Sequence, residues 1–124
     1  EVEKRPKTFM YFEGDMGYFM DMESYETVNF PKTKIGDAAL FLTENLEVEG
    51  LYIGGELLDI LLPSSVAMKV VSASPGTKGN SATSPTKSII LENGTTIQSP
   101  LFIKEGDTVK IDTFTGEYVE RIAK

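Results

Sequence analysis

Short runs rich in apolar and aromatic residues follow one another along most of the chain, separated by polar, turn-forming residues. The segment YETVNF at 25–30 shows the alternation typical of a half-buried strand. Gly54-Gly55 and Asn93-Gly94 each lie between two such runs, and these residues tolerate the positive φ that hairpin turns require. The pattern predicts strands at 8–13, 17–22, 25–30, 46–53, 56–62, 66–73, 88–91, 95–99, 107–113 and 117–122.

One segment has a different period. Ile35, Ala38, Ala39 and Leu42 recur at helical spacing, so we expect a short amphipathic helix over 34–45. Short strands at this density, with a single helix, predict an all-β fold made of small antiparallel barrels.

The chain is expected to divide near its middle. Pro63-Ser64-Ser65 is polar and turn-prone, and a new strand follows it. We therefore predict one domain at 1–63 and another at 64–124, each with five strands. The charged segment 1–7 contains Pro6 and is interpreted as residual linker.

Composition excludes several classes of site. The 124 residues include neither Cys nor His, so disulfides, thiolate metal sites and most nucleophile–base pairs are unavailable. No apolar run approaches the ~20 residues of a membrane span. We expect a non-enzymatic protein without cofactor or metal, with neither membrane nor DNA as a partner, and monomeric.

Charge is unevenly distributed. Residues 1–62 contain 13 acidic and 5 basic side chains, whereas residues 63–124 contain 6 and 7. The resulting net charges of −8 and +1 make up the −7 of the chain. Bulk attraction to nucleic acid is therefore disfavoured, and any RNA contact is expected in the second half.

The most informative segment is the polar loop at 74–86 together with the residues that follow it. Loops of this length in a compact domain are commonly functional. Its backbone N–H groups, hydroxyls, amide and cation suit phosphate, ribose and base-edge contacts. A solvated hairpin loop is the alternative interpretation. Nucleotide binding is disfavoured, because no GxxxxGK[ST] run is present.

This segment carries a family resemblance. The motifs are Pro75-Gly76-Thr77-Lys78-Gly79, then Lys87, Gly94, Ile97, Pro100, Ile103 and Gly106, and finally Ile111-Asp112-Thr113 and Gly116-Glu117-Tyr118-Val119. Their spacing is similar to that of bacterial elongation factor P, and the resemblance extends over nearly the whole chain. It implies two tandem five-stranded barrels of the oligonucleotide-binding (OB) type, the middle and C-terminal domains of that family, with the N-terminal domain absent.

The resemblance also implies a function and a site. Family members bind the ribosome between the peptidyl and exit transfer-RNA sites and assist peptide-bond formation on polyproline-stalled ribosomes. The implied partners are peptidyl-tRNA, messenger RNA at the exit site and small-subunit proteins, in a bacterial cytoplasm or an organellar stroma or matrix. The missing domain carries the modified residue that reaches the peptidyl-transferase centre. The implied messenger-RNA contacts are Lys78, Gly79, Asn80 and Ser81.

Lys87, Arg121 and Lys124 are candidates for transfer-RNA phosphate contacts, with Arg121 preferred because its guanidinium matches phosphate oxygens. Exposed, solubilising charge is the alternative interpretation of each. The chain departs from the family pattern at Asn80-Ser81, where Asp-Thr is usual, and also at Ile89 and Ser99.

Two further functions stay open: a general single-stranded RNA-binding barrel, and an acidic protein-interaction module. The aromatic residues of the first half could form a base-stacking platform. Because their neighbours are acidic, we interpret them as core residues instead. They are Phe9, Tyr11, Phe12, Tyr18 and Phe19.

Overall fold

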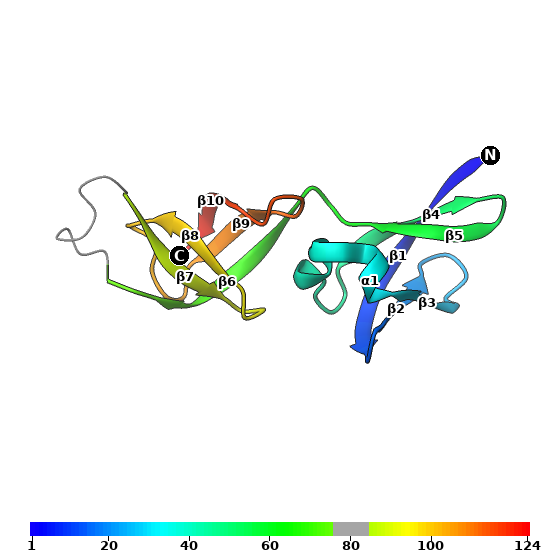
Figure 1. Ribbon diagram of the computed structural model, residues 1–124, viewed down its shortest axis with the longest axis horizontal. Coiled ribbons are helices and arrows are strands. Elements are labelled where there is room, and N and C mark those ends of the chain that lie inside the picture. The colour runs from blue at the N-terminus through cyan, green and yellow to red at the C-terminus, as the bar shows by residue number, and fades with distance from the viewer. Residues whose placement is uncertain (76–84) are drawn as a thin grey trace. The chain divides into compact units, whose positions relative to one another are not determined.

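The computed structural model describes residues 1–75 and 85–124. Strands dominate both halves, as predicted, and the chain forms two compact units, Glu1–Pro63 and Ser64–Lys124 (Figure 1). Each unit contains a five-stranded antiparallel sheet that curls on itself, which confirms the expected all-β fold with two OB-type domains.

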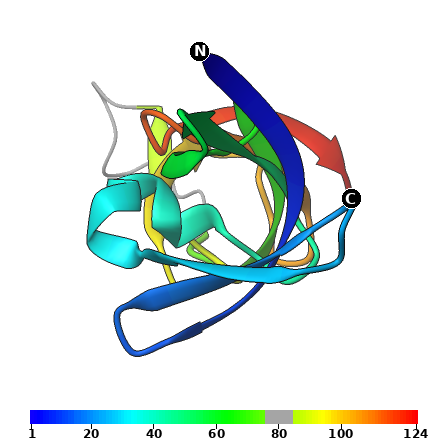
Figure 2. The ribbon, with the colours of Figure 1, turned by 90° about the vertical axis from the view of Figure 1, so that its right-hand side faces the viewer.

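In the first unit the sheet order is β3-β2-β1-β4-β5. The long first strand curves so that its N-terminal half pairs with β4 and its C-terminal half with β2 (Figure 2, blue). A bulge at Met10 lies between the pairs that Phe9 and Tyr11 make with β2, and bulges increase strand bending. The strands are β1 (Val2–Glu13), β2 (Met16–Asp21), β3 (Thr27–Pro31), β4 (Glu47–Ile53) and β5 (Glu56–Leu61).

Alternate residues of these strands point into one core. Phe9 and Phe19 face each other across β1 and β2, with ring centroids 5.4 Å apart in an edge-on arrangement. Burial of such rings supplies much of the stabilisation of a small domain. The buried cluster consists of Phe9, Phe19, Phe30, Leu42, Val48 and Ile60.

The segment expected to be residual linker is strand from Val2 onward, so that interpretation was wrong. Lys7, within this segment, is only 1% exposed, and its Nζ lies 3.1 Å from Oδ2 of Asp21. Gly50 makes room for the lysine stem, since a Cβ there would lie 2.7 Å from Lys7 Cε. The charged segment 1–7 therefore contains a lysine that is part of the interior of the first unit.

The expected helix over 34–45 is shorter and divided in two. Helix α1 (Lys32–Ile35) ends at Gly36, whose φ of +81° lies outside the helical region. A 3-10 helix, η1 (Gly36–Phe41), continues and buries Ala39 and Phe41. Helical spacing predicted the apolar face correctly, but not the break that glycine introduces.

The second unit has the sheet order β10-β9-β6-β7-β8. Its first strand also serves two neighbours, pairing with β9 through Ser65–Lys69 and with β7 beyond Lys69. The predicted hairpin at Asn93-Gly94 is confirmed, with Gly94 at a φ of +87°. The strands are β6 (Ser65–Ala73), β7 (Thr86–Leu91), β8 (Thr96–Pro100), β9 (Thr108–Asp112) and β10 (Tyr118–Ala123).

The core of the second unit is aliphatic. Ile89 on β7 and Ile111 on β9 are fully buried. The other apolar residues with at most 1% exposure here are Met68, Val70, Leu91, Ile103 and Val109. Because side chains alternate along a strand, Ser88 on β7 and Gln98 on β8 lie on the outer face of the sheet, opposite to the buried Ile89 and Ser99.

Candidate RNA-binding surface

A groove of about 600 Å³ lies along β8, between this edge strand and the segment that joins β9 to β10. It forms because β8 and β10, at opposite ends of the strand order, come into contact as the sheet curls. OB folds bind oligonucleotides on strands 2 and 3 and the loops after strands 1 and 4, and the groove occupies this position. Its lining is Thr86, Thr96, Ile97, Gln98, Ser99, Pro100, Gly116, Glu117 and Tyr118.

Two lining residues, Thr86 and Gln98, belong to a chain of hydrogen-bonded polar side chains on the outer face of β7 and β8. Thr86 Oγ1 donates a hydrogen bond to Gln98 Oε1 at 3.1 Å, and Gln98 Nε2 donates to Ser88 Oγ at 2.9 Å. These two bonds fix the orientation of the Gln98 amide. An amide has both donors and acceptors for base edges, and all three side chains are exposed.

The opposite wall of the groove follows a turn between β9 and β10 that is closed by hydrogen bonds to Asp112. Oδ1 of Asp112 accepts hydrogen bonds from the N–H groups of Phe114 at 2.7 Å and Thr115 at 3.0 Å. The Asp112 N–H donates to the carbonyl oxygen of Glu117 at 2.9 Å. Gly116 adopts a φ of +76° within this turn, a conformation that favours glycine. The groove is thus lined by backbone in a fixed conformation.

Tyr118 follows this turn and is half-buried in the lining of the groove. Burial raises the pKa of its phenol above the ordinary value. A tyrosine hydroxyl can both donate and accept a hydrogen bond.

The sequence matches two family models, one for each unit. Residues 2–60 match "Elongation factor P (EF-P) OB domain", and residues 66–121 match "Elongation factor P, C-terminal". Over 120 residues, the chain is 48% identical to elongation factor P of Moorella thermoacetica, covering 97% of this chain and 65% of the relative. The protein of the same name from Elusimicrobium minutum is also 48% identical, covering 97% of this chain and 64% of that one.

The chain belongs to the elongation factor P family. It carries the OB and C-terminal domains of that family, and it spans about 65% of the length of the curated relatives that it matches.

The residues predicted for RNA binding in this family member occupy different places. Lys78, Gly79, Asn80 and Ser81 lie outside the described residues. Lys87 is half-buried on β7 and pairs with buried Ser99, so its side chain leaves the sheet on the face opposite to the Thr86–Gln98 wall.

Arg121 lies on β10 and is already engaged. Its guanidinium stands 5.2 Å from the ring centroid of Phe102 and 3.8 Å from Oδ2 of Asp107. Its side chain is 32% exposed, so it is partly accessible to solvent. Neither Arg121 nor Lys87 lines the groove.

Sequence reasoning missed Gln98 and Tyr118 as candidates. The available signal was alternation, since Thr86 and Ser88 on one strand and Thr96 and Gln98 on the next predict a polar face shared by two paired strands. Within residues 1–75 and 85–124, no cluster of three potential metal ligands occurs. No helix in the same residues has the length and apolarity needed to cross a bilayer.

Proposed function

We propose that the chain acts in translation as the ribosome-binding part of an elongation factor P. In this role it occupies the space between the peptidyl and exit transfer-RNA sites and assists peptide-bond formation on ribosomes stalled at consecutive prolines. Its partners are peptidyl-tRNA, messenger RNA at the exit site and small-subunit proteins, in the cytoplasm of a bacterium. It binds and positions without catalysing a step itself.

The two units divide this role by charge. The first unit carries 13 acidic and 5 basic side chains, which repel phosphate backbones and suppress indiscriminate RNA binding. The second unit is close to neutral, so its polar surface can approach RNA. Ribosomal geometry then selects where the chain binds.

The observation that carries the proposal is the groove along β8. It has the position at which OB folds bind nucleic acid, and Gln98 and Tyr118 are among the residues that line it. Thr86, at one end of the groove, follows the loop that contains Lys78, Gly79, Asn80 and Ser81. We assign messenger-RNA contact to these four residues together with the groove, and transfer-RNA contact to Lys87 and Arg121.

The test measures binding of the chain to ribosomes that carry peptidyl-tRNA and messenger RNA. The double variant Lys78→Ala/Asn80→Ala should weaken binding roughly tenfold, since each lost polar contact contributes about two- to tenfold. Gln98→Ala should weaken it about threefold. Lys69→Ala is the matched control, because it removes the same charge from an exposed position on β6.

Two results would contradict the assignment. Unchanged binding of the double variant would remove the loop from the mechanism. An equal loss in Lys69→Ala would show that general charge, and not the loop, controls binding.

A general single-stranded RNA-binding protein is the second candidate, favoured by the same groove. It predicts measurable affinity for free oligonucleotides and a steep fall in affinity with salt. Filter binding at two salt concentrations separates the two candidate functions, because a ribosome-specific factor should have little affinity for free RNA at either salt concentration.

A further inference from the structure

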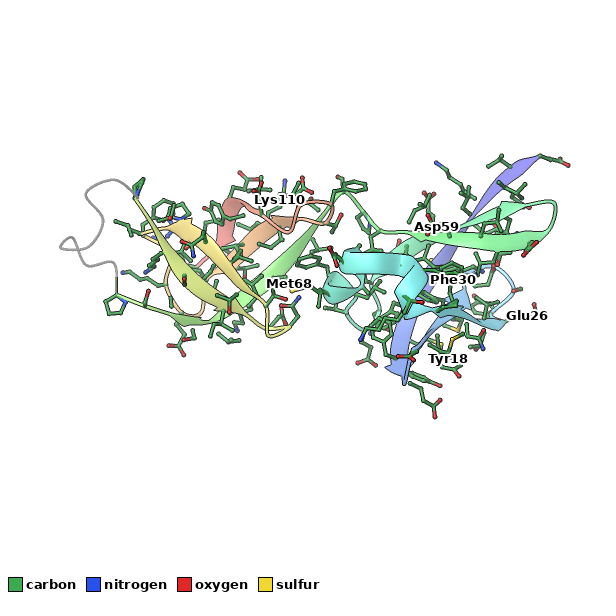
Figure 3. All side chains as sticks on the ribbon, viewed as in Figure 1. Tyr18, Glu26, Phe30, Asp59, Met68 and Lys110 are labelled. Carbon is green, nitrogen blue, oxygen red and sulfur yellow. The ribbon has the colours of Figure 1, made fainter. Side chains whose placement is uncertain are left out.

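The outer face of the first unit carries a pair of tyrosines that the core does not use. The rings of Tyr11 on β1 and Tyr18 on β2 are stacked, with centroids 5.1 Å apart and an interplanar angle of 26°. Tyr11 is 49% exposed. The core interpretation of the aromatic residues is therefore right for the three phenylalanines Phe9, Phe12 and Phe19 but wrong for the two tyrosines. Tyr18 lies on the outside of the unit, whereas Phe30 lies in its interior (Figure 3).

Strand register defines what surrounds these rings. Directly paired residues share a face of a sheet, and the face alternates along each strand. One row of the outer face contains Glu13 paired with Met16. The row on the other side of the tyrosines contains Glu47, Thr8 and Met20. We call the six residues Tyr11, Tyr18, Met16, Met20, Glu13 and Glu47 the tyrosine face.

The tyrosine face combines aromatic surface with negative charge. Aromatic rings attract cations through the negative potential of their faces, and adjacent carboxylates strengthen this attraction. Glu13 and Glu47 are exposed on opposite sides of the stacked pair. The methionines add unbranched apolar side chains that adapt to a partner. The favoured ligand is thus a flat, delocalised cation that stacks on an aromatic ring, which describes the guanidinium of arginine.

Aromatic rings already hold cations elsewhere in the first unit. The guanidinium carbon of Arg5 lies 5.2 Å from the ring centroid of Tyr52. The ammonium of Lys32 lies 4.6 Å from the ring centroid of Phe12. The environment of this unit, with its excess of carboxylates, therefore supports such contacts.

We propose that the tyrosine face binds an arginine-rich segment of a partner protein. Charge complementarity decides between this partner and a nucleic acid. A unit with 13 acidic and 5 basic side chains repels the phosphates that any stacked base brings with it. The same charge attracts a basic polypeptide and accelerates its association. The proposal uses a different unit from the RNA contacts assigned above, so either can fail without the other.

The experiment compares two labelled nonapeptides of equal charge, one with arginine and glycine alternating and one with lysine and glycine. Binding to the full chain is followed by fluorescence anisotropy. The chain should prefer the arginine peptide. The double variant Tyr11→Ala/Tyr18→Ala should bind it roughly five- to tenfold more weakly and lose the preference over lysine, since each exposed cation–π contact contributes about two- to fivefold.

Tyr25→Ala is the matched control, because Tyr25 is 72% exposed in the same unit but lies outside the tyrosine face. It should bind both peptides as the unmodified chain does. Glu13→Gln/Glu47→Gln provides a second variant that leaves the rings in place and should also weaken binding of the arginine peptide. Amide spectra of each variant establish that it is folded.

Unchanged affinity in the folded tyrosine variant would overturn the proposal, because charge alone would then account for binding. The proposal would also fail if an oligouridine, and not the arginine peptide, perturbed the amide resonances of Tyr11 and Tyr18. That result would identify the face as a base-stacking platform.

Discussion

The two units share one strand topology but differ in the connections between their strands. In each unit the first strand lies at the centre of the order, pairs with two neighbours and carries a bulge against the second strand, at Met10 and at Val71. The first unit joins its first two strands through Gly14-Asp15, whereas the second uses the long segment after Ala73. The sheet order therefore does not depend on which loop is elaborated, and loops can acquire binding residues independently.

A six-residue turn occurs in both units at different places. Asp21–Glu26 (DMESYE) joins β2 to β3, and Asp112–Glu117 (DTFTGE) joins β9 to β10. In both, the aspartate Oδ1 accepts from the N–H groups two and three residues later, and a Ser or Thr hydroxyl accepts from the final glutamate N–H. The hydrogen bonds are those of a local motif, so they form wherever two strands require that spacing.

The interiors differ at one matched position. Lys7 and Met68 both lie three residues before the bulge of their strand, and they pair with Val48 and Val109 respectively. Each side chain is 1% exposed. The first unit thus places an ammonium where the second places a thioether (Met68 is labelled in Figure 3). Asp21 explains the difference, because it supplies the charge that makes a buried lysine tolerable.

Replacing Lys7 with the residue of the second unit should produce the largest effect. Lys7→Met leaves the Asp21 carboxylate buried without its partner, and breaking such a pair is strongly destabilising. The melting temperature of the first unit should fall by roughly 10–20 °C, read from amide resonances unit by unit. The second unit should be unaffected.

Two controls sharpen this prediction. Lys7→Met/Asp21→Asn removes both charges but keeps a side-chain oxygen that accepts the hydrogen bonds of the turn. It should recover most of the lost melting temperature.

Hydrogen bonds from the Ser24 and Glu23 N–H groups, and then the Lys7 ammonium, hold the pKa of Asp21 well below its ordinary value. The stability from this charge is present above about pH 4 and is lost as pH falls through the folded pKa. The difference in melting temperature of the first unit between the unmodified chain and Lys7→Met should therefore become smaller as the pH is lowered. A difference that stays constant with pH would contradict the role of the ion pair.

The same comparison shows what sequence could predict. The hairpin at Asn93-Gly94 was predictable because its signal is local. Lys7 was not, because its burial depends on Asp21, 14 residues away, and on the space above Gly50. The groove was not predictable either, since Gln98 and Tyr118 lie on different strands and line the same groove only once the sheet curls. Strand β3 begins at Thr27 and not at Tyr25, because Tyr25 belongs to the shared turn.

The shared turn predicts an intermediate effect. Its fifth residue adopts positive φ in both units: Gly116 at +76° and Tyr25 at +63°. Gly116→Ala should destabilise the second unit by about 1 kcal/mol, because Cβ disfavours this conformation. Tyr25→Gly should stabilise the first unit, by less than 1 kcal/mol, because glycine also gains entropy in the unfolded chain. Urea denaturation measures both, and changes of the same sign would refute the equivalence of the two turns.

The smallest effect is expected for an ion pair on the surface. Lys110 Nζ lies 3.3 Å from Glu120 Oε2 between β9 and β10, nearly the separation of Lys7 and Asp21, but the two side chains are 37% and 59% exposed. Solvent screens this pair, so Glu120→Gln should change the free energy of unfolding by less than about 0.5 kcal/mol in urea denaturation. Raising the salt concentration should remove even that difference. A loss above about 1 kcal/mol would mean that distance, and not burial, sets the contribution of lysine–carboxylate pairs in these two units.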